Sequence, residues 1–548
     1  MTTTHFGLTR FERLVSRITR VRHGEGRAVF LFFLHAFLLV ASLQMVKALR
    51  EALILTKFSA EVRSYAVAMM AVILMLIVPL YAKARRRVDA DRLLRTVTIF
   101  FMLTLPLLAM LTWYGVPIAF VFYVWVGIYG VMVVAQMWAY AADSFNVKTG
   151  QRLFVVIMLG ANLGALFGAK LTSLTVANLS PVGLMLLATA AIGSTLFLAK
   201  PERASVPEGS RAVPVAKQIG SAPSLLDGIA LVLRDRYLLM IALFVMLLNW
   251  INSTGEFILS DYVKAHASTV VAAGGDTSRY IAAFYGNFNF WVTLCSLAIQ
   301  LLLVSRIYQT IGVRGALLVH PAIVAIGYGV LAFGPLLGGF IPVFSLIRRI
   351  KVADNGVDYS LMNTTRQTLF LPVDRDSKYD GKMAVDTIFV RLGDLIQAAG
   401  VFVGLHLLGW QAYQFAFLNF LLALVWIALA VAMGRAYSRK SAQNVTNAAP
   451  EPAEPIPDLH CVPGKSFRHT VSPAAFHDPD PGDVLVLKAC CDDGRPLPRW
   501  VRFDVRRQIF VGTLPHGLEV TELRVVVIAS DMDGLKARST FTVRRVSM

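Results

Sequence analysis

The chain has 548 residues, of which 56% are hydrophobic and only 16% are charged. A soluble domain usually carries about 25% charged residues, so this composition excludes an ordinary soluble enzyme, a disordered chain and a small disulfide-stapled secreted module. The formal net charge is +19, and such a basic excess is typical of inner-membrane proteins, whose cytoplasmic loops are rich in Lys and Arg. We therefore expect a polytopic membrane protein with a soluble part attached, and no nucleic-acid partner.

Twelve stretches of the chain are apolar and long enough to cross a bilayer, which takes about 20 residues of helix. They cover residues 28–48, 64–83, 94–114, 116–139, 153–173, 180–199, 237–257, 280–305, 314–334, 337–357, 386–408 and 411–434. The tenth stretch is the weakest, because Arg348, Arg349 and Lys351 interrupt it. The sequence thus predicts an all-α membrane part with twelve transmembrane helices.

Basic residues lie before the first stretch and after every second stretch that follows, whereas the turns near residues 115, 175, 335 and 409 carry almost none. The positive-inside rule then predicts that both termini are cytoplasmic, in the inner (plasma) membrane of a bacterium. Residues 1–27 form a basic cytoplasmic segment, and the apolar run behind it is too long for a cleavable signal peptide.

The twelve stretches fall into two halves of six, residues 28–199 and 237–434, joined by a polar cytoplasmic loop at 200–236. A 6+6 arrangement with a long central loop is the layout of the major facilitator transporters. In that architecture the substrate binds near the membrane midplane, between the two halves. We therefore expect a binding site to which both halves contribute.

Three charged residues lie at and just beyond the end of the first span. Lys47, Arg50 and Glu51 lie in the segment MVKALREALILT, in which apolar residues continue past the charges to Thr56. Lys47 and Arg50 are three residues apart and share a helix face, and two cations that face one cavity would attract a multiply charged anion. The alternative is that these long side chains reach from the span to the membrane boundary.

Other ionisable residues in or beside the spans are candidates for transport or for structural ion pairs. Glu256 is near the end of the seventh span, and Asp143 follows the fourth span with Arg152 as a candidate partner. Arg391 and Asp394 are three residues apart in the eleventh span, where a structural intrahelical pair is the alternative to a transport role.

Gly160, Gly164 and Gly168 form a GxxxGxxxG row in the fifth span, which predicts a close contact between two helices. We interpret the single histidines His35 and His320 as packing or hydrogen-bonding residues rather than as a proton relay. The chain has no phosphate-binding P-loop and no nucleophile motif. We therefore expect neither an enzyme nor a resident cofactor or metal ion.

Four segments of the membrane part carry a more specific pattern. They are VKALREALILT in the first span, WAYAADSFNVKTGQRLF after the fourth, the stretch from Glu256 to YIAAFYGNFNF, and YSLMNTTRQTLFLPVDRDSKYDGKMAVDTIFVRLGD after the tenth. Through these segments residues 30–435 resemble the ATP/ADP antiporters, the nucleotide transporters of plastids and intracellular bacteria. The last segment is the most specific, since residue types and spacing hold along its length.

The resemblance implies a secondary transporter that exchanges ATP for ADP or carries related nucleotides. A nucleotide is polyanionic, and cationic side chains bind phosphate oxygens through charge-assisted hydrogen bonds. The positions that the spans and the resemblance single out as substrate-binding or transport residues are Lys47, Arg50, Glu51, Asp143, Glu256, Arg366, Lys382 and Arg391.

The chain also departs from the family pattern. Arg50 and Arg366 stand where the family has lysine, and Asn287, Asn363 and Gln367 stand at positions of family acids. A planar guanidinium is not equivalent to the point charge of lysine. Two alternatives therefore stay open: a transporter of a different organic anion, with proton coupling, and a transporter-derived membrane scaffold or sensor that acts through the C-terminal domain.

The C-terminal part has a different composition from the membrane part. Residues 435–457 are rich in Ala, Pro and Asn, as linkers are, and in 458–548 the apolar residues alternate with period two. This pattern predicts a small all-β sandwich. The stretches 476–483, 497–500 and 510–515 resemble a dystroglycan-type, cadherin-like or Ig-like repeat, for which we expect a protein partner.

Five aspartates of this domain are weak candidates for Ca²⁺ ligands: Asp478, Asp480, Asp483, Asp531 and Asp533. A single repeat has no neighbour to complete a shared site, and the predicted cytoplasmic side is poor in Ca²⁺. We therefore favour the alternative that these aspartates form turns.

Overall fold

The computed structural model describes residues 25–87, 90–145, 147–204, 225–272, 275–334, 342–373, 381–444, 449–480, 484–505, 507–516, 522–531 and 534–546. The chain divides into two compact units, Met1–Ser438 and Arg439–Met548. The first unit is helical and the second is built of β-strands. Asp374, Asp483 and Asp533, and the basic segment 1–24, lie outside the described residues.

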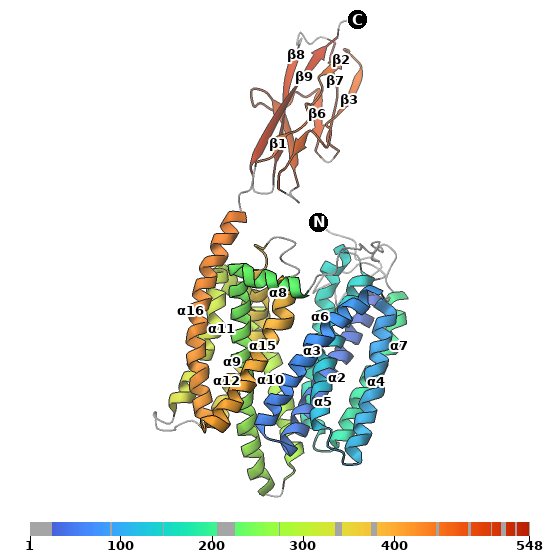
Figure 1. The fold of residues 1–548 in the computed structure, drawn as a ribbon. Coiled ribbons are helices and arrows are strands. Elements are labelled where there is room, and N and C mark those ends of the chain that lie inside the picture. The colour runs from blue at the N-terminus through green and yellow to red at the C-terminus, as the bar shows by residue number, and fades with distance from the viewer. Residues whose placement is uncertain are drawn as a thin grey trace. The chain divides into compact units, whose positions relative to one another are not determined.

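The helices of the first unit form two groups that lie side by side (Figure 1). The first group is α2 (Gly26–Lys57), α3 (Ala60–Arg87), α4 (Ala90–Trp113), α5 (Ala119–Ser144), α6 (Val147–Thr175) and α7 (Pro181–Ala204). The second begins with the short helix α8 (Leu225–Arg234) and continues with α9 (Arg236–Ala272), α10 (Thr277–Leu302) and α11 (Val304–Phe333). The expected division into two halves of the membrane part is thus visible in the fold.

The second group ends with helices that contain π-helical segments. α12 (Val343–Val357) runs through the π-segment η3 (Asp358–Met362) into α13 (Asn363–Leu369). The next pass consists of η4 (Val385–Phe389), α15 (Val390–Phe402) and η5 (Val403–Leu407), and α16 (Ala412–Asn444) follows. A π-segment inserts an extra residue into a helical turn and is frequent at functional sites.

Ten helical segments within the described ranges are long and apolar enough to cross a membrane. The remaining two of the twelve predicted spans correspond to α10 and to the continuous helical stretch from α12 to α13. The second of these is less apolar because it carries the charges that weakened the prediction, and Lys351 there is fully buried in the protein. The prediction of a polytopic all-α membrane part is confirmed.

α2 is longer than the span predicted for it. It continues to Lys57, nine residues beyond the predicted end at 48, so Lys47, Arg50 and Glu51 lie inside the helix. Buried residues occur along its whole length, because α5, α6, α7 and α10 all pack against it. Lys47, Arg50 and Glu51 therefore lie within the helix bundle rather than at a membrane boundary.

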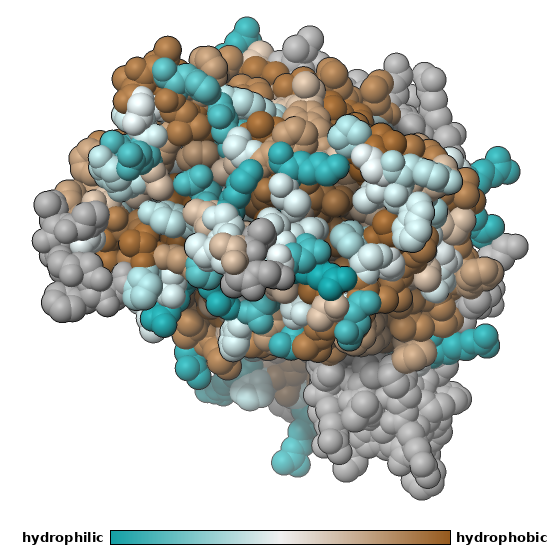
Figure 2. All heavy atoms as spheres, turned by 90° about the horizontal axis from the view of Figure 1, so that it is seen from below, coloured by the Kyte–Doolittle hydropathy of each residue, from teal (hydrophilic) through white to brown (hydrophobic). Residues whose placement is uncertain are grey.

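The face of this unit at which α2 ends carries hydrophilic side chains across its middle, among hydrophobic ones (Figure 2). A hollow of about 470 Å³ opens near this end and is lined by residues of α3, α9, η5 and α16. Its lining includes the carboxylates of Glu61 and Asp261 beside Trp410 and Tyr413. A negative lining of this kind does not suit a polyanion.

The second unit is a β-sandwich, as predicted. Its strands are β1 (Glu451–Pro452), β2 (Leu459–Cys461), β3 (Ser466–Thr470), β4 (Phe476–His477), β5 (Val486–Cys491), β6 (Val501–Asp504), β7 (Ile509–Thr513), β8 (Glu522–Ser530) and β9 (Lys536–Arg545). A four-stranded sheet in the order β2-β9-β8-β5 faces a three-stranded sheet in the order β3-β7-β6, and β1 pairs with β4. Phe510 and Phe541 pack edge to face in the shared core, with their ring centroids 5.1 Å apart.

The described candidates for Ca²⁺ ligands form turns. Asp478 Oδ1 accepts a hydrogen bond from the backbone N–H of Asp480 at 3.0 Å, and Asp531 Oδ1 accepts one from the backbone N–H of Leu535 at 2.8 Å. Within the described part of the chain, no group of three or more potential ligands could hold a metal ion. This geometry supports the turn interpretation.

The glycine row of the fifth span lies against α2. A Cβ at Gly160 would lie 2.5 Å from the carbonyl oxygen of Phe33, and Cβ atoms at Gly164 and Gly168 would lie even closer to the carbonyls of Phe37 and Ala41. Backbone can approach backbone this closely only where the side chain is a hydrogen atom. The prediction of close helix packing is confirmed.

We expect Gly164→Ala to push α2 and α6 apart and to destabilise the membrane unit by about 1–3 kcal/mol. The measurement is the thermal unfolding midpoint of the detergent-solubilised protein. The matched control is Gly400→Ala on α15, where a Cβ would meet nothing within 4 Å. Equal midpoints for the two variants would contradict the close contact.

Candidate functional site

The corner between α2 and α3 brings three charged side chains together. Since α2 ends at Lys57 and α3 begins at Ala60, the first turn of α3 lies beside the last turns of α2. Arg63 Nε donates to Glu51 Oε2 at 2.6 Å, and Arg50 Nη2 donates to Glu51 Oε1 at 2.6 Å. One carboxylate thus holds two guanidinium groups.

Two cations of α2 lie one turn apart on the same face. Lys47 is half-buried and interacts electrostatically with both Arg50 and Glu51. The Arg50 guanidinium lies over the ring of Tyr123 on α5, 4.2 Å from its centroid, where the negative face of the ring stabilises a cation. The side chain of Arg50 stays 16% exposed, so part of this charge is available to a ligand.

A second polar cluster joins α9, α11 and α12. The fully buried Lys351 Nζ donates to Asp354 Oδ2 at 2.7 Å and to Asn252 Oδ1 at 2.5 Å. The other oxygen of Asp354 lies 2.7 Å from His320 Nε2. The interpretation of His320 as a hydrogen-bonding residue therefore agrees with its position.

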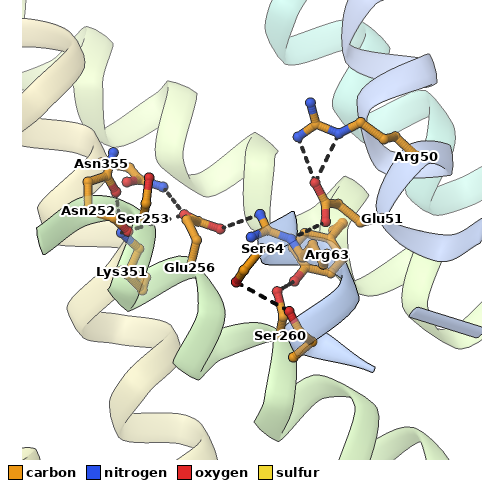
Figure 3. A network of polar contacts seen from close by, with 12 residues as sticks. Arg50, Glu51, Arg63, Ser64, Asn252, Ser253, Glu256, Ser260, Lys351 and Asn355 are labelled. Carbon is orange, nitrogen blue, oxygen red and sulfur yellow. Dashed lines mark hydrogen bonds and ion pairs between the residues drawn. The ribbon is translucent and has the colours of Figure 1, made fainter. Parts of the chain in front are cut away.

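Glu256 connects the two clusters (Figure 3). Asn355 Nδ2 donates to its Oε1 at 2.9 Å, and Lys351 Nζ lies 3.5 Å from the same oxygen. Its Oε2 lies 3.5 Å from Arg63 Nη2. Since Arg63 belongs to the first group of helices and Glu256 to the second, this ion pair joins the two halves.

Further polar contacts between the halves lie at the same end of the bundle. There, in the described ranges, Gln397 Nε2 donates to Ser64 Oγ at 3.3 Å, His406 Nε2 lies 2.6 Å from Glu61 Oε1, and Lys264 Nζ donates to the carbonyl of Phe58. All these residues lie near the end of α2, near the start of α3, in the later part of α9, in α15 or in η5. The halves are thus held together where α2 ends.

Charge alternates along this network. The sequence of contacts is Arg50–Glu51–Arg63–Glu256–Lys351–Asp354. A buried ion pair is tolerated only when good geometry and further hydrogen bonds offset the loss of hydration. Three cations and three carboxylates in alternation satisfy this condition, and Lys47 adds a positive charge beside them.

The predicted partner of Arg152 is wrong. Its guanidinium donates to both carboxylate oxygens of Glu25, at 3.2 and 2.9 Å, so Arg152 ties the start of α6 to the start of α2. Asp143 is exposed near the end of α5 and is not part of the charged network.

Two other predicted cations lie in a separate cluster. Arg366 interacts electrostatically with Asp358 of η3 and with Asp386 of η4, and Lys382 also interacts with Asp386. Lys382 Nζ donates to Gln367 Oε1. This cluster follows η3 along the chain and is distinct from the network around Glu256.

Arg391 and Asp394 form the intrahelical contact that was the alternative to a transport role. Arg391 Nη1 lies 3.5 Å from Asp394 Oδ2, while Asp394 Oδ1 accepts a hydrogen bond from Ser253 Oγ at 2.7 Å. The backbone carbonyl of Val390 accepts a further hydrogen bond from Asn249. These contacts fasten α15 to α9.

The sequence analysis missed Arg63, Lys351 and Asp354 as site residues. Arg63 precedes the predicted span 64–83 by one residue, whereas α3 begins at Ala60 and includes it. Lys351 was treated as a weakness of the tenth span. The signal was present, because a charge inside an otherwise apolar span marks a buried partner.

Comparison with known proteins finds a family match for part of each unit. Residues 175–437 match the TLC ATP/ADP transporter family, and residues 449–546 match the He_PIG family of Ig domains. The membrane unit is related to the ATP/ADP transporters. The match spans Glu256, Arg366 and Lys382 but begins after α2. The assignment of the α2 cations to the site is therefore supported by the sequence motifs and by the structure.

Two curated relatives agree with the family match. The chain is 21% identical over 373 residues to the "ADP,ATP carrier protein 1" of Chlamydia pneumoniae, covering 61% of this chain and 70% of the relative. It is 22% identical over 361 residues to the protein of the same name from Chlamydia trachomatis, covering 59% of this chain and 66% of the relative. The matched stretch thus spans about two thirds of these relatives.

The fold is that of a multi-pass membrane transporter with a major-facilitator-like arrangement. A crystal structure of a POT family transporter in complex with 5-aminolevulinic acid superposes with a TM-score of 0.55 at 14% identity, covering 76% of this chain and 97% of that one. At this identity the likeness concerns the fold alone. Family and fold together are those of a carrier rather than an enzyme.

We expect Lys351→Ala to destabilise the membrane unit by about 3–5 kcal/mol, because it leaves Asp354 buried without its cation. Asp354→Ala should cost a similar amount, and the double variant should cost less than the sum of the two. Thermal unfolding of the three purified variants measures these energies.

The control pair is Arg279 and Asp276, whose side chains are 52% and 54% exposed. Truncation of Arg279 should cost at most about 1 kcal/mol, whereas truncation of Asp276 should cost up to about 2 kcal/mol because its carboxylate also caps α10. If the loss of stability in the double variant equalled the sum of the losses in Lys351→Ala and Asp354→Ala, the buried pairing would be contradicted.

Proposed function

We propose that this protein is a secondary transporter that exchanges nucleotides, ATP and ADP or related nucleoside phosphates, by alternating access. The observation that carries the proposal is the match of the second half to the ATP/ADP transporter family. The relatives' name, "ADP,ATP carrier protein 1", supports the same substrate class. Lys47, Arg50, Glu51, Glu256, Arg366 and Lys382 are the described residues that we assign to substrate binding or transport.

The charged network suits this role because its cations are held by carboxylates of the protein itself. Phosphate oxygens accept the same bidentate, charge-assisted hydrogen bonds from a guanidinium as a carboxylate does. A bound nucleotide would therefore compete with Glu51 for Arg50, the most exposed cation of the network, with Lys47 one turn away. We assign the first phosphate contact to these two residues.

The same network links binding to movement of the halves. The Arg63–Glu256 pair joins them at 3.5 Å, and opening that end of the bundle requires this pair to separate. A substrate that redistributes the charges around Glu51 changes the partners of Arg63. Exchange results if the halves can move after a substrate has redistributed these charges but cannot move while the site is empty.

We place both termini in the cytoplasm of a bacterial cell, with the chain in the inner membrane. The basic segments support this orientation. In this orientation the end at which α2 meets α3 faces outward, so the inter-half contacts close the outer side. The β-sandwich is then cytoplasmic, and we assign it to contact with a protein partner.

The first experiment is uptake of labelled ATP and ADP by intact bacterial cells that express the chain. We expect uptake of each to be competed by the other, and Arg50→Ala to reduce it by about tenfold to a hundredfold, because one charged hydrogen bond to phosphate is worth about 1.5–3 kcal/mol. Lys57→Ala, an exposed cation at the end of α2, is the matched control and should transport normally.

A chain that ends at Asn444 is the third arm of this experiment. Retained exchange assigns transport to the membrane unit, and its loss would favour a sensor that acts through the β-sandwich. Uptake that disappears when the proton gradient is collapsed would favour the proton-coupled alternative. No uptake, with the protein shown to be in the membrane, would refute the proposed substrate class.

The orientation can be tested by labelling with a membrane-impermeant maleimide. Gln411→Cys, exposed at the outward end, should react in intact cells, whereas Arg439→Cys, exposed near the end of α16, should react only after lysis. The reverse pattern would place both termini outside.

A further inference from the structure

The side chain of Tyr359 is exposed, although the helical segment that carries it packs against other helices of the bundle. It lies in η3 and is 56% exposed, whereas the residues that follow it, Ser360, Leu361 and Met362, are buried. η3 interrupts a helix that both α10 and α11 contact. An extra residue in a helical turn changes the direction in which the side chains point, and such segments recur at functional sites.

Tyr359 lies in the neighbourhood of the charged network. It lies four residues, about one helical turn, after Asn355, which donates a hydrogen bond to Glu256. It interacts electrostatically with Glu256 and Lys351 of its own half and with Arg50 of the other half. Charges of both halves do not surround a side chain that faces lipid, so the exposed ring borders the space between the halves.

The other tyrosines around the network are not available to a ligand. Tyr123, Tyr285 and Tyr328 are all buried. Tyr123 lies beneath Arg50, and the hydroxyl of Tyr285 is hydrogen-bonded to Ser260. Among the described tyrosines that interact with the network, Tyr359 is the one with an open face.

We propose that the ring of Tyr359 stacks on the base of the substrate while Arg50 and Lys47 hold its phosphates. This inference rests on the proposed function. A nucleotide carries an aromatic base and a polyanionic chain, and an exposed aromatic ring that interacts electrostatically with Arg50 offers a partner to the base while the guanidinium offers one to the phosphates. Stacking on an aromatic side chain is tolerant of base identity, because every base has a π-face. Tyr359 therefore discriminates nucleotides from phosphates that have no base, but it does not discriminate between bases.

The test is binding of labelled ATP to the purified full chain and to Tyr359→Phe, Tyr359→Leu and Tyr359→Ala. We expect the phenylalanine variant to bind within about twofold of the unchanged protein, and the leucine and alanine variants to bind about tenfold to a hundredfold more weakly, as the loss of one stacked base predicts. Inhibition by tripolyphosphate, which has no base, should be the same for all four proteins. Tyr413→Ala, an exposed tyrosine of α16, is the matched control and should bind ATP normally.

The outcomes separate this inference from the proposed function. Absence of ATP binding by the unchanged protein overturns the proposed function and this inference together. Normal ATP binding by the alanine variant, or a loss in the phenylalanine variant as large as in the alanine variant, overturns stacking and leaves exchange intact. A thermal unfolding midpoint measured for each variant distinguishes loss of binding from loss of the fold.

Discussion

A charge inside a membrane protein is stable only where an opposite charge or a set of hydrogen bonds replaces its lost water. Here that constraint is met by strict alternation. Glu51 lies between two arginines, Glu256 lies between Arg63 and Lys351, and each carboxylate accepts from more than one donor. The alternation runs from α2 to α12 and so crosses from one half of the bundle to the other. The same groups that make the buried charges tolerable therefore decide how the halves are joined.

Helix packing determines where these charges can meet. The glycine row of α6 lets α2 lie against it backbone to backbone, which fixes the helix that carries Arg50 and Glu51. The two-residue corner after α2 then brings Arg63 beside Glu51 and within reach of Glu256. On the other side, Gly255 permits the close approach of Tyr328 and Lys351 to α9, next to Glu256. Small residues thus set the distances over which the long charged side chains interact.

A carrier needs contacts that are strong enough to define a state and weak enough to exchange. The Lys351–Asp354 pair, at 2.7 Å and fully enclosed, has the properties of a structural element. The Arg63–Glu256 pair, at 3.5 Å and with Glu256 partly exposed, has the properties of a contact that can be replaced. Arg50 and Tyr359 are partly exposed beside the network, and they are the residues that we propose to contact the substrate first. The contacts of the network therefore range from the enclosed Lys351–Asp354 pair to the replaceable Arg63–Glu256 pair.

The sequence determined the membrane class, the two halves, a close helix contact at the glycine row of the fifth span, and the β-sandwich, because apolar length, periodicity and glycine spacing are local properties of the chain. It also singled out Arg50 and Glu256, because a charge within an apolar run is visible in one dimension. Only the tertiary structure decided which charges are partners. Arg63 precedes a predicted span, and Lys351 interrupts one, so neither was identified as a site residue. Arg152 pairs with Glu25, 127 residues away, rather than with Asp143. Coulomb interactions act through space, so the order of charges along the chain does not fix their pairing until the helices are packed.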